Sequence, residues 1–105
     1  MQTIQMISQS AEAQMIIERV SWFTEQDIMQ RTKKRDVVEA RQIAMYIILE
    51  KHILTQREIS ELFDMNHSTV AHAIKTVRDL LDTDTTFKLK YNNLIQVSLN
   101  QKYYG

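Results

Sequence analysis

A polar run stands at the predicted start of an amphipathic helix, and its residue types suit contact with DNA. The run comprises Asn66, His67, Ser68 and Thr69, followed one and two turns later by His72 and Lys75. Asparagine can pair with adenine through two hydrogen bonds, serine and threonine can bond bases or phosphates, and a threonine methyl can meet the thymine methyl. Asn66 and Ser68 are also of types that cap helices, so a purely structural interpretation stays open for them.

The same run offers two other kinds of chemistry, and both lack a necessary part. His67 and His72 are five residues apart, about 140° around a helix, so they cannot share a metal ion as a pair four residues apart would. Ser68 and His72 are four residues apart and resemble a nucleophile with its base. No acidic residue that would orient the histidine is apparent, nor are oxyanion donors. We therefore expect no enzymatic activity, no metal and no cofactor.

The distribution of charge favours a polyanionic partner, although the chain as a whole carries no net charge. Residues 1–30 have a net charge of −3, whereas residues 31–78 hold nine basic and six acidic residues, a net of +3. The densest basic stretch combines Arg31 with Lys33, Lys34 and Arg35. Such a cluster attracts nucleic acid. On composition alone it is equally consistent with a solvated loop.

Composition excludes several classes of function. The chain has 105 residues, one glycine at the last position, no proline and no cysteine. Without internal glycine it cannot form a glycine-rich phosphate loop or a dinucleotide-binding turn, so we expect no nucleotide binding through either. Tight hairpins also favour glycine, which makes helices more plausible than strands. The absence of cysteine excludes disulfides, cysteine zinc sites and thiol nucleophiles.

Two observations bear on where the chain resides. The first basic residue is Arg19, so the N-terminus lacks the charged start of a signal peptide. No apolar run approaches the roughly 18 residues of a membrane span. We expect a cytoplasmic protein without contact to a membrane.

Hydrophobic periodicity predicts an all-α fold, a compact bundle of five to six helices in a single domain over residues 1–105. Residues 1–20 are expected to form a helical N-terminal extension of this domain. The predicted helical segments cover residues 9–23, a short turn within 25–30, 36–52, 55–63, 67–82 and about 87–97. Asp36 is the predicted N-cap of the third segment. Trp22 and Tyr46 are predicted to lie in the core, with Met15 and Phe23 on the buried stripe of the first segment.

Two of these segments have the layout of a helix-turn-helix. Thr55 and Glu58 have the spacing of a capping box ahead of the short helix at about 55–63. A three-residue break separates it from the longer amphipathic helix at about 67–82. In this motif the second helix enters the major groove by its N-terminal residues, and the polar run occupies that position here.

Two motifs connect this layout to a known family. They are Arg41-Gln42-Ile43-Ala44-Met45-Tyr46 and His67-Ser68-Thr69-Val70-Ala71-His72-Ala73. In order and separation they resemble the C-terminal DNA-binding domain of the bacterial chromosomal replication initiator (DnaA) family, from about residue 20 to 98. The resemblance implies a helix-turn-helix that binds duplex DNA at short asymmetric boxes. It also implies that Arg41 enters the minor groove beside the basic loop, while His67-Ser68-Thr69 faces the major groove.

The chain departs from the family pattern at several positions. The family usually has proline where this chain has Ala40, and Glu39 brings a negative charge close to Arg41. The family's turn is typically Gly-Gly-Arg-Asp, whereas Asp64-Met65-Asn66 is one residue shorter and lacks the arginine and the aspartate. The same DNA box therefore cannot be assumed. The chain is also too short to contain the family's ATP-hydrolysing domain.

The sequence thus predicts sequence-preferring binding of double-stranded DNA by a stand-alone domain, in replication, transcription or a mobile element. The alternative is a helical protein-interaction module that kept the scaffold but lost its affinity for DNA. The partner surface of that module, or a surface for self-association, would be the N-terminal helix with Met6, Ile7, Met15, Ile16 and Trp22. DNA binding requires the basic residues to lie on one face with the start of the 67–82 helix. They are Lys33, Lys34, Arg35, Arg41 and Lys75.

Overall fold

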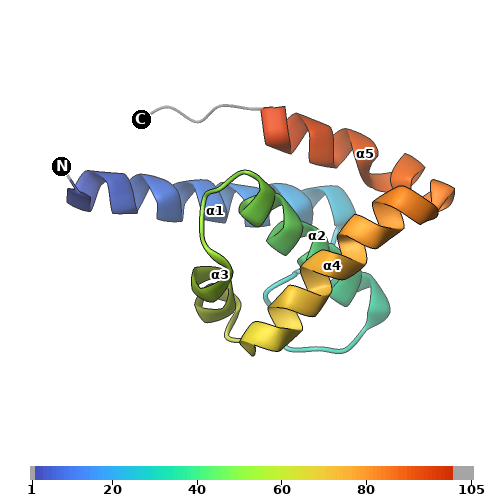
Figure 1. Ribbon diagram of the computed structural model, residues 1–105, viewed down its shortest axis with the longest axis horizontal. Coiled ribbons are helices and arrows are strands. Elements are labelled where there is room, and N and C mark those ends of the chain that lie inside the picture. Colours follow the sequence, from blue (N-terminus) through green and yellow to red (C-terminus); the bar gives the residue numbers. More distant parts are fainter. Residues whose placement is uncertain (1, 101–105) are drawn as a thin grey trace.

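A computed structural model describes residues 2–100, together with the side-chain surroundings of residue 9 and residues 11–100. The described chain folds into five helices and no strand (Figure 1). They are α1 (Gln2–Thr24), α2 (Arg35–Glu50), α3 (Gln56–Phe63), α4 (His67–Thr83) and α5 (Thr85–Asn100). The predicted all-α fold is confirmed. Residues 25–30 form turns and not a helix, although Ile28 among them is buried in the core.

Helix α2 is the centre of the fold, because it contacts each of the other four helices. It begins at Arg35, with Lys34 as its N-cap and no capping bond from that side chain. The prediction that Asp36 caps this helix is therefore wrong. Asp36 lies inside the first turn instead, where a carboxylate is favoured by the positive end of the helix dipole.

Helix α1 buries a narrower face than the sequence suggests. Its core residues are Ala13, Ile16, Ile17 and Val20. Trp22 is nine positions after Ala13, about 180° around the helix, and its exposed fraction is 83%. Met15 and Phe23 are also exposed, at 43% and 41%. The predicted burial of these three side chains is wrong, whereas Tyr46 is partly buried and packs against the core as expected.

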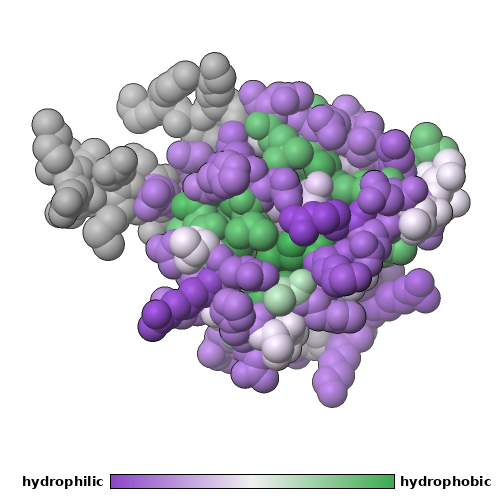
Figure 2. All heavy atoms as spheres, in the orientation of Figure 1, coloured by the Kyte–Doolittle hydropathy of each residue, from purple (hydrophilic) through white to green (hydrophobic). Residues whose placement is uncertain are grey.

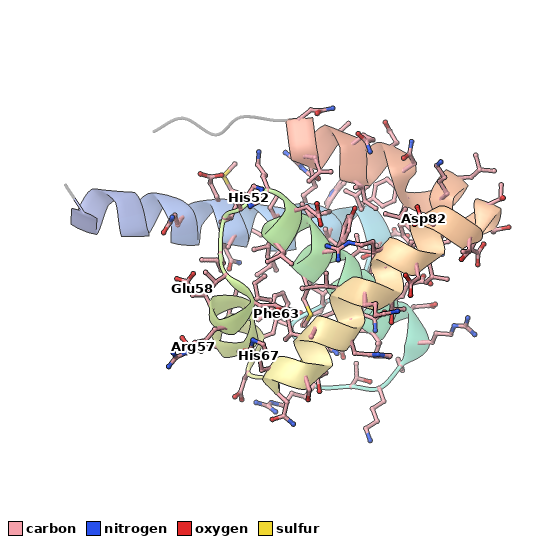
Figure 3. The ribbon with its side chains drawn as sticks, viewed as in Figure 1. His52, Arg57, Glu58, Phe63, His67 and Asp82 are labelled. Atoms are coloured by element: carbon pink, nitrogen blue, oxygen red, sulfur yellow. The ribbon has the colours of Figure 1, made fainter. Side chains whose placement is uncertain are left out.

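The helix-turn-helix forms within a residue of its predicted bounds. At the start of α3 the Thr55 hydroxyl accepts a hydrogen bond from the Glu58 backbone N–H at 3.2 Å, and Glu58 Oε1 accepts one from the Thr55 N–H at 2.9 Å. Hydrogen bonds to its carboxylate from the backbone and from the side chain of Thr55 lower the pKa of Glu58. Helix α3 ends at Phe63, and its C-cap Asp64 adopts a left-handed conformation with φ of 53°. Phe63 points from this helix into the interior (Figure 3).

Removal of the capping box should destabilise the domain. For Thr55→Ala we expect a loss of about 1 kcal/mol in the free energy of unfolding, because the Glu58 backbone N–H loses the hydroxyl that accepts its hydrogen bond. Urea unfolding followed by circular dichroism measures this loss. The matched control is Thr86→Ala in the exposed first turn of α5, which should change stability by less than about 0.5 kcal/mol. Equal effects of the two substitutions would contradict a stabilising role for the box.

Polar contacts join α2 to the helices that follow it. The Tyr91 hydroxyl on α5 donates a hydrogen bond to Glu39 Oε2 at 2.5 Å, and Arg78 on α4 pairs with Glu50 at 2.6 Å. Burial, with the hydrogen bond to Glu39, raises the pKa of Tyr91.

Figure 2 shows hydrophilic side chains over much of the face turned to the viewer, with hydrophobic ones between them. None of the helices within residues 2–100 is long and apolar enough to cross a membrane.

Candidate nucleic-acid interface

The loop between α1 and α2 and the start of α4 lie at the same edge of the molecule (Figure 1). A groove of about 600 Å³ runs between this loop, α2, the turn after α3 and the first turns of α4. Lys33 from the loop, Arg41 from α2 and Thr69 from α4 all line it. Three predicted site residues that are far apart in the sequence therefore meet at one groove.

The polar run at the start of α4 is exposed along its whole length. Its exposed residues are Asn66, His67, Ser68, Thr69, His72 and Lys75. His67 lies at the tip of α4, where the chain enters the helix (Figure 3). Asn66 is the N-cap by its backbone conformation, but its side chain makes no capping hydrogen bond. Capping therefore does not account for the Asn66 amide.

Helix α4 separates its exposed and buried residues in the way a reading helix requires. Val70, Ala73, Ile74 and Val77 are buried against the core. Thr69, next to Val70, is exposed and lines the groove. Lys75 forms an exposed ion pair with Asp79 at 2.9 Å. Such a pair stabilises a protein only weakly, so the lysine can exchange this partner for a phosphate.

Three exposed cations, two in the basic loop and one at the first residue of α2, have no acidic partner within the described residues. Lys33, Lys34 and Arg35 are exposed, and none of them forms an ion pair with an acidic group in the described part of the chain. Arg31 differs, because it pairs with Asp64 in the turn of the helix-turn-helix. The sequence did not predict this ion pair, because 33 residues separate Arg31 from Asp64 and no local pattern connects them.

Arg41 occupies a different environment from the other basic residues of the site. Its exposed fraction is 6%. Nε donates a hydrogen bond to the Ile28 carbonyl at 2.9 Å, and one terminal nitrogen donates to the Gln30 carbonyl at 2.6 Å. Burial lowers the pKa of Arg41, yet a guanidinium keeps its charge in proteins. The structure thus joins Arg41 to the basic loop, while insertion into a minor groove stays a prediction.

The negative charge of Glu39 is directed toward α5. Its Oε2 accepts a hydrogen bond from the Tyr91 hydroxyl and lies 3.9 Å from Lys90 Nζ. In Figure 1, α5 lies on the opposite side of the molecule from the basic loop. Glu39 therefore has partners away from the groove, and its charge is a weaker argument against DNA binding than the sequence suggested.

Comparison with known proteins agrees with this geometry. The family described as the bacterial DnaA protein helix-turn-helix matches residues 12–77. That range contains the basic loop, Arg41 and the polar run. No solved structure gives a significant match.

The similar curated proteins are replication initiators. The chromosomal replication initiator protein DnaA of Flavobacterium psychrophilum is 42% identical over 62 residues, which are 58% of this chain and 13% of that protein. The corresponding protein of Bacteroides thetaiotaomicron is 35% identical over 65 residues, 61% of this chain and 14% of that protein. The chain thus spans only about one-seventh of the length of these relatives. By the family match over residues 12–77, the chain belongs to the bacterial DnaA helix-turn-helix family.

Proposed function

We propose that this protein binds double-stranded DNA with a preference for particular sequences, with the start of α4 in the major groove. Family membership supports DNA binding by a DnaA-like domain. The observation that carries the proposal is the shared groove, because Lys33 and Thr69 line it from opposite elements. A basic loop beside the exposed tip of a helix suits a duplex, whose phosphates flank a groove about 12 Å wide.

The two elements have different tasks in this proposal. Lys33, Lys34 and Arg35 have no ion-pair partner within the described residues, and in this proposal they contact phosphates without regard to sequence. The polar residues of α4 contact base edges and neighbouring phosphates, and they supply the preference. They are Asn66, His67, Ser68, Thr69, His72 and Lys75.

The decisive experiment is selection of bound sites from random duplex DNA by the purified protein. The proposal expects recovery of a short asymmetric consensus from repeated rounds. If the recovered duplexes show no consensus and bind only at low salt, the protein binds DNA non-specifically, and the proposed sequence preference is refuted. Failure to retain any duplex at low salt would refute DNA binding altogether.

We further propose that the domain formed by these 105 residues does not itself bind ATP. The sequence has no internal glycine, and a phosphate loop needs several. Titration with ATP in a calorimeter should give no saturable heat. Stoichiometric binding would overturn this part of the proposal.

A second role is favoured by the surface of α1 and of the loop that follows it. Trp22, Phe23, Met15 and Met29 are large apolar side chains with exposed fractions of 41% or more. Apolar residues gathered on a surface commonly mark a protein contact. We propose that this surface mediates self-association alongside DNA binding. Of the residues in the interaction-module alternative it keeps Met15 and Trp22, whereas Ile16 is buried in the core and the side chains of Met6 and Ile7 lie outside the described ones.

The Trp22→Ala variant tests this second role. We expect the wild type to self-associate with rising concentration in sedimentation velocity, and Trp22→Ala to stay monomeric with unchanged thermal stability, because the indole is almost fully solvated. The matched control is Leu89→Ala, which removes an equally exposed apolar side chain on α5. A wild type that stays monomeric at millimolar concentration would exclude self-association.

A further inference from the structure

The loop that carries the basic residues is held by an arginine of the central helix. Arg41 is buried and donates hydrogen bonds to the carbonyls of Ile28 and Gln30, both in the middle of that loop. Ile28 is itself fully buried. The guanidinium therefore connects α2 with the backbone that leads directly into Lys33 and Lys34.

The loop has few other attachments. Two local hydrogen bonds shape it: the Met29 N–H donates to Asp27 Oδ1 and the Lys34 N–H donates to Thr32 Oγ1, both at 3.2 Å. A second arginine, Arg31, pairs with Asp64 across the groove. That pair is exposed, with side-chain exposures of 79% and 77%, so solvent weakens it. The buried bonds of Arg41 are the stronger of the two attachments.

We propose that Arg41 is a positioning residue for DNA binding, which holds the basic loop so that its cations meet the same duplex as α4. The inference rests on the proposed function and replaces the predicted insertion of Arg41 into a minor groove. Insertion would require both hydrogen bonds to break and would leave the Ile28 carbonyl without its partner, which costs free energy. A loop ordered before binding also avoids the entropy cost of being ordered during binding.

The salt dependence of binding distinguishes the two roles of Arg41. If Arg41 acts through the loop, Arg41→Ala should reduce the slope of log K against log salt concentration by more than one unit. The slope measured for Arg41→Ala should then approach the slope measured for the triple variant Lys33→Ala/Lys34→Ala/Arg35→Ala. Adding Arg41→Ala to that triple variant should cause little further loss, because the loop cations through which it acts are gone. If Arg41 instead contacts DNA directly, its loss of affinity should add to that of the triple variant, and the salt slope should change by about one unit. The affinity lost should also depend on whether the site has an A/T-rich flank. Those results would overturn the proposal.

Two matched variants separate positioning from charge and from folding. Arg41→Lys keeps the positive charge but lacks the planar fork that spans two carbonyls, so it should lose affinity nearly as Arg41→Ala does. Asp64→Asn removes the exposed attachment and tolerates the left-handed conformation at this position, so its affinity should stay within about threefold of the wild type. An equal loss in Asp64→Asn would contradict the assignment to Arg41.

A measurement on the wild type keeps the proposal testable if Arg41 variants unfold. The Nε–H of Arg41 should give a slowly exchanging signal in nitrogen-15 NMR, and that signal should hardly shift when duplex DNA is added. A large shift together with loss of exchange protection would show that the guanidinium leaves the loop, and it would overturn positioning while leaving DNA binding intact. A wild type that binds no duplex would refute the proposed function and this inference together.

Discussion

Thr69→Ala should reduce affinity for the preferred duplex by on the order of 1–3 kcal/mol and reduce affinity for random duplex far less. Thr69 is exposed and lines the groove. Its hydroxyl makes no hydrogen bond within residues 2–100, so it does not cap α4. In the proposed docking mode, loss of the hydroxyl and methyl removes a contact with DNA and leaves the fold unchanged. Thermal unfolding should give a melting temperature near that of the wild type.

The neighbouring residue provides the control for Thr69. Val70 is fully buried, so Val70→Ala should act through stability, by roughly 0.5–1.5 kcal/mol as for other small core truncations. The fraction of Val70→Ala that stays folded should keep the wild-type ratio of affinities. The assay titrates each variant against a selected and a scrambled duplex at one salt concentration. Wild-type affinity of Thr69→Ala for the selected duplex would exclude Thr69 as a reader.

The helix-turn-helix could be predicted from the sequence because its determinants are local. Thr55 and Glu58 define the start of α3 by a bond pattern that spans three residues. The buried positions of α4 recur at the helical spacing, from Val70 to Val77. The family motifs also lie within single helices. Each of these signals is complete within a few residues of chain.

Tertiary contacts could not be predicted in the same way. The burial of Arg41 depends on carbonyls 11 and 13 residues away, and the partner of Glu39 is Tyr91, 52 residues away. A charge counted along the sequence carries no information about the direction of its side chain. Trp22 shows a related effect, because a hydrophobic type predicts burial while its angular position on α1 exposes it.

The basic loop supplies the last prediction, which concerns affinity common to all duplexes. Lys34→Ala should reduce the slope of log K against log salt concentration by roughly one unit, because one phosphate contact no longer releases a counterion. Each lost contact should lower affinity roughly eightfold at 0.1 M salt. The triple variant of Lys33, Lys34 and Arg35 should therefore lose affinity by two to three orders of magnitude in this approximation. The loss should be the same for selected and scrambled duplexes, since phosphates carry no sequence information.

The control for this prediction has the same change in net charge at a distant position. Lys88 is exposed on α5, the helix that lies across the molecule from the basic loop (Figure 1), and has no ion-pair partner within the described residues. Lys88→Ala should leave the salt slope unchanged, because its ammonium does not contact the bound duplex. Fluorescence anisotropy of labelled duplexes between 50 and 200 mM salt (roughly the range over which counterion release dominates) measures both slopes. Equal slopes for Lys34→Ala and Lys88→Ala would place Lys34 outside the interface, whereas an unchanged slope with altered base preference would make Lys34 a reader of bases.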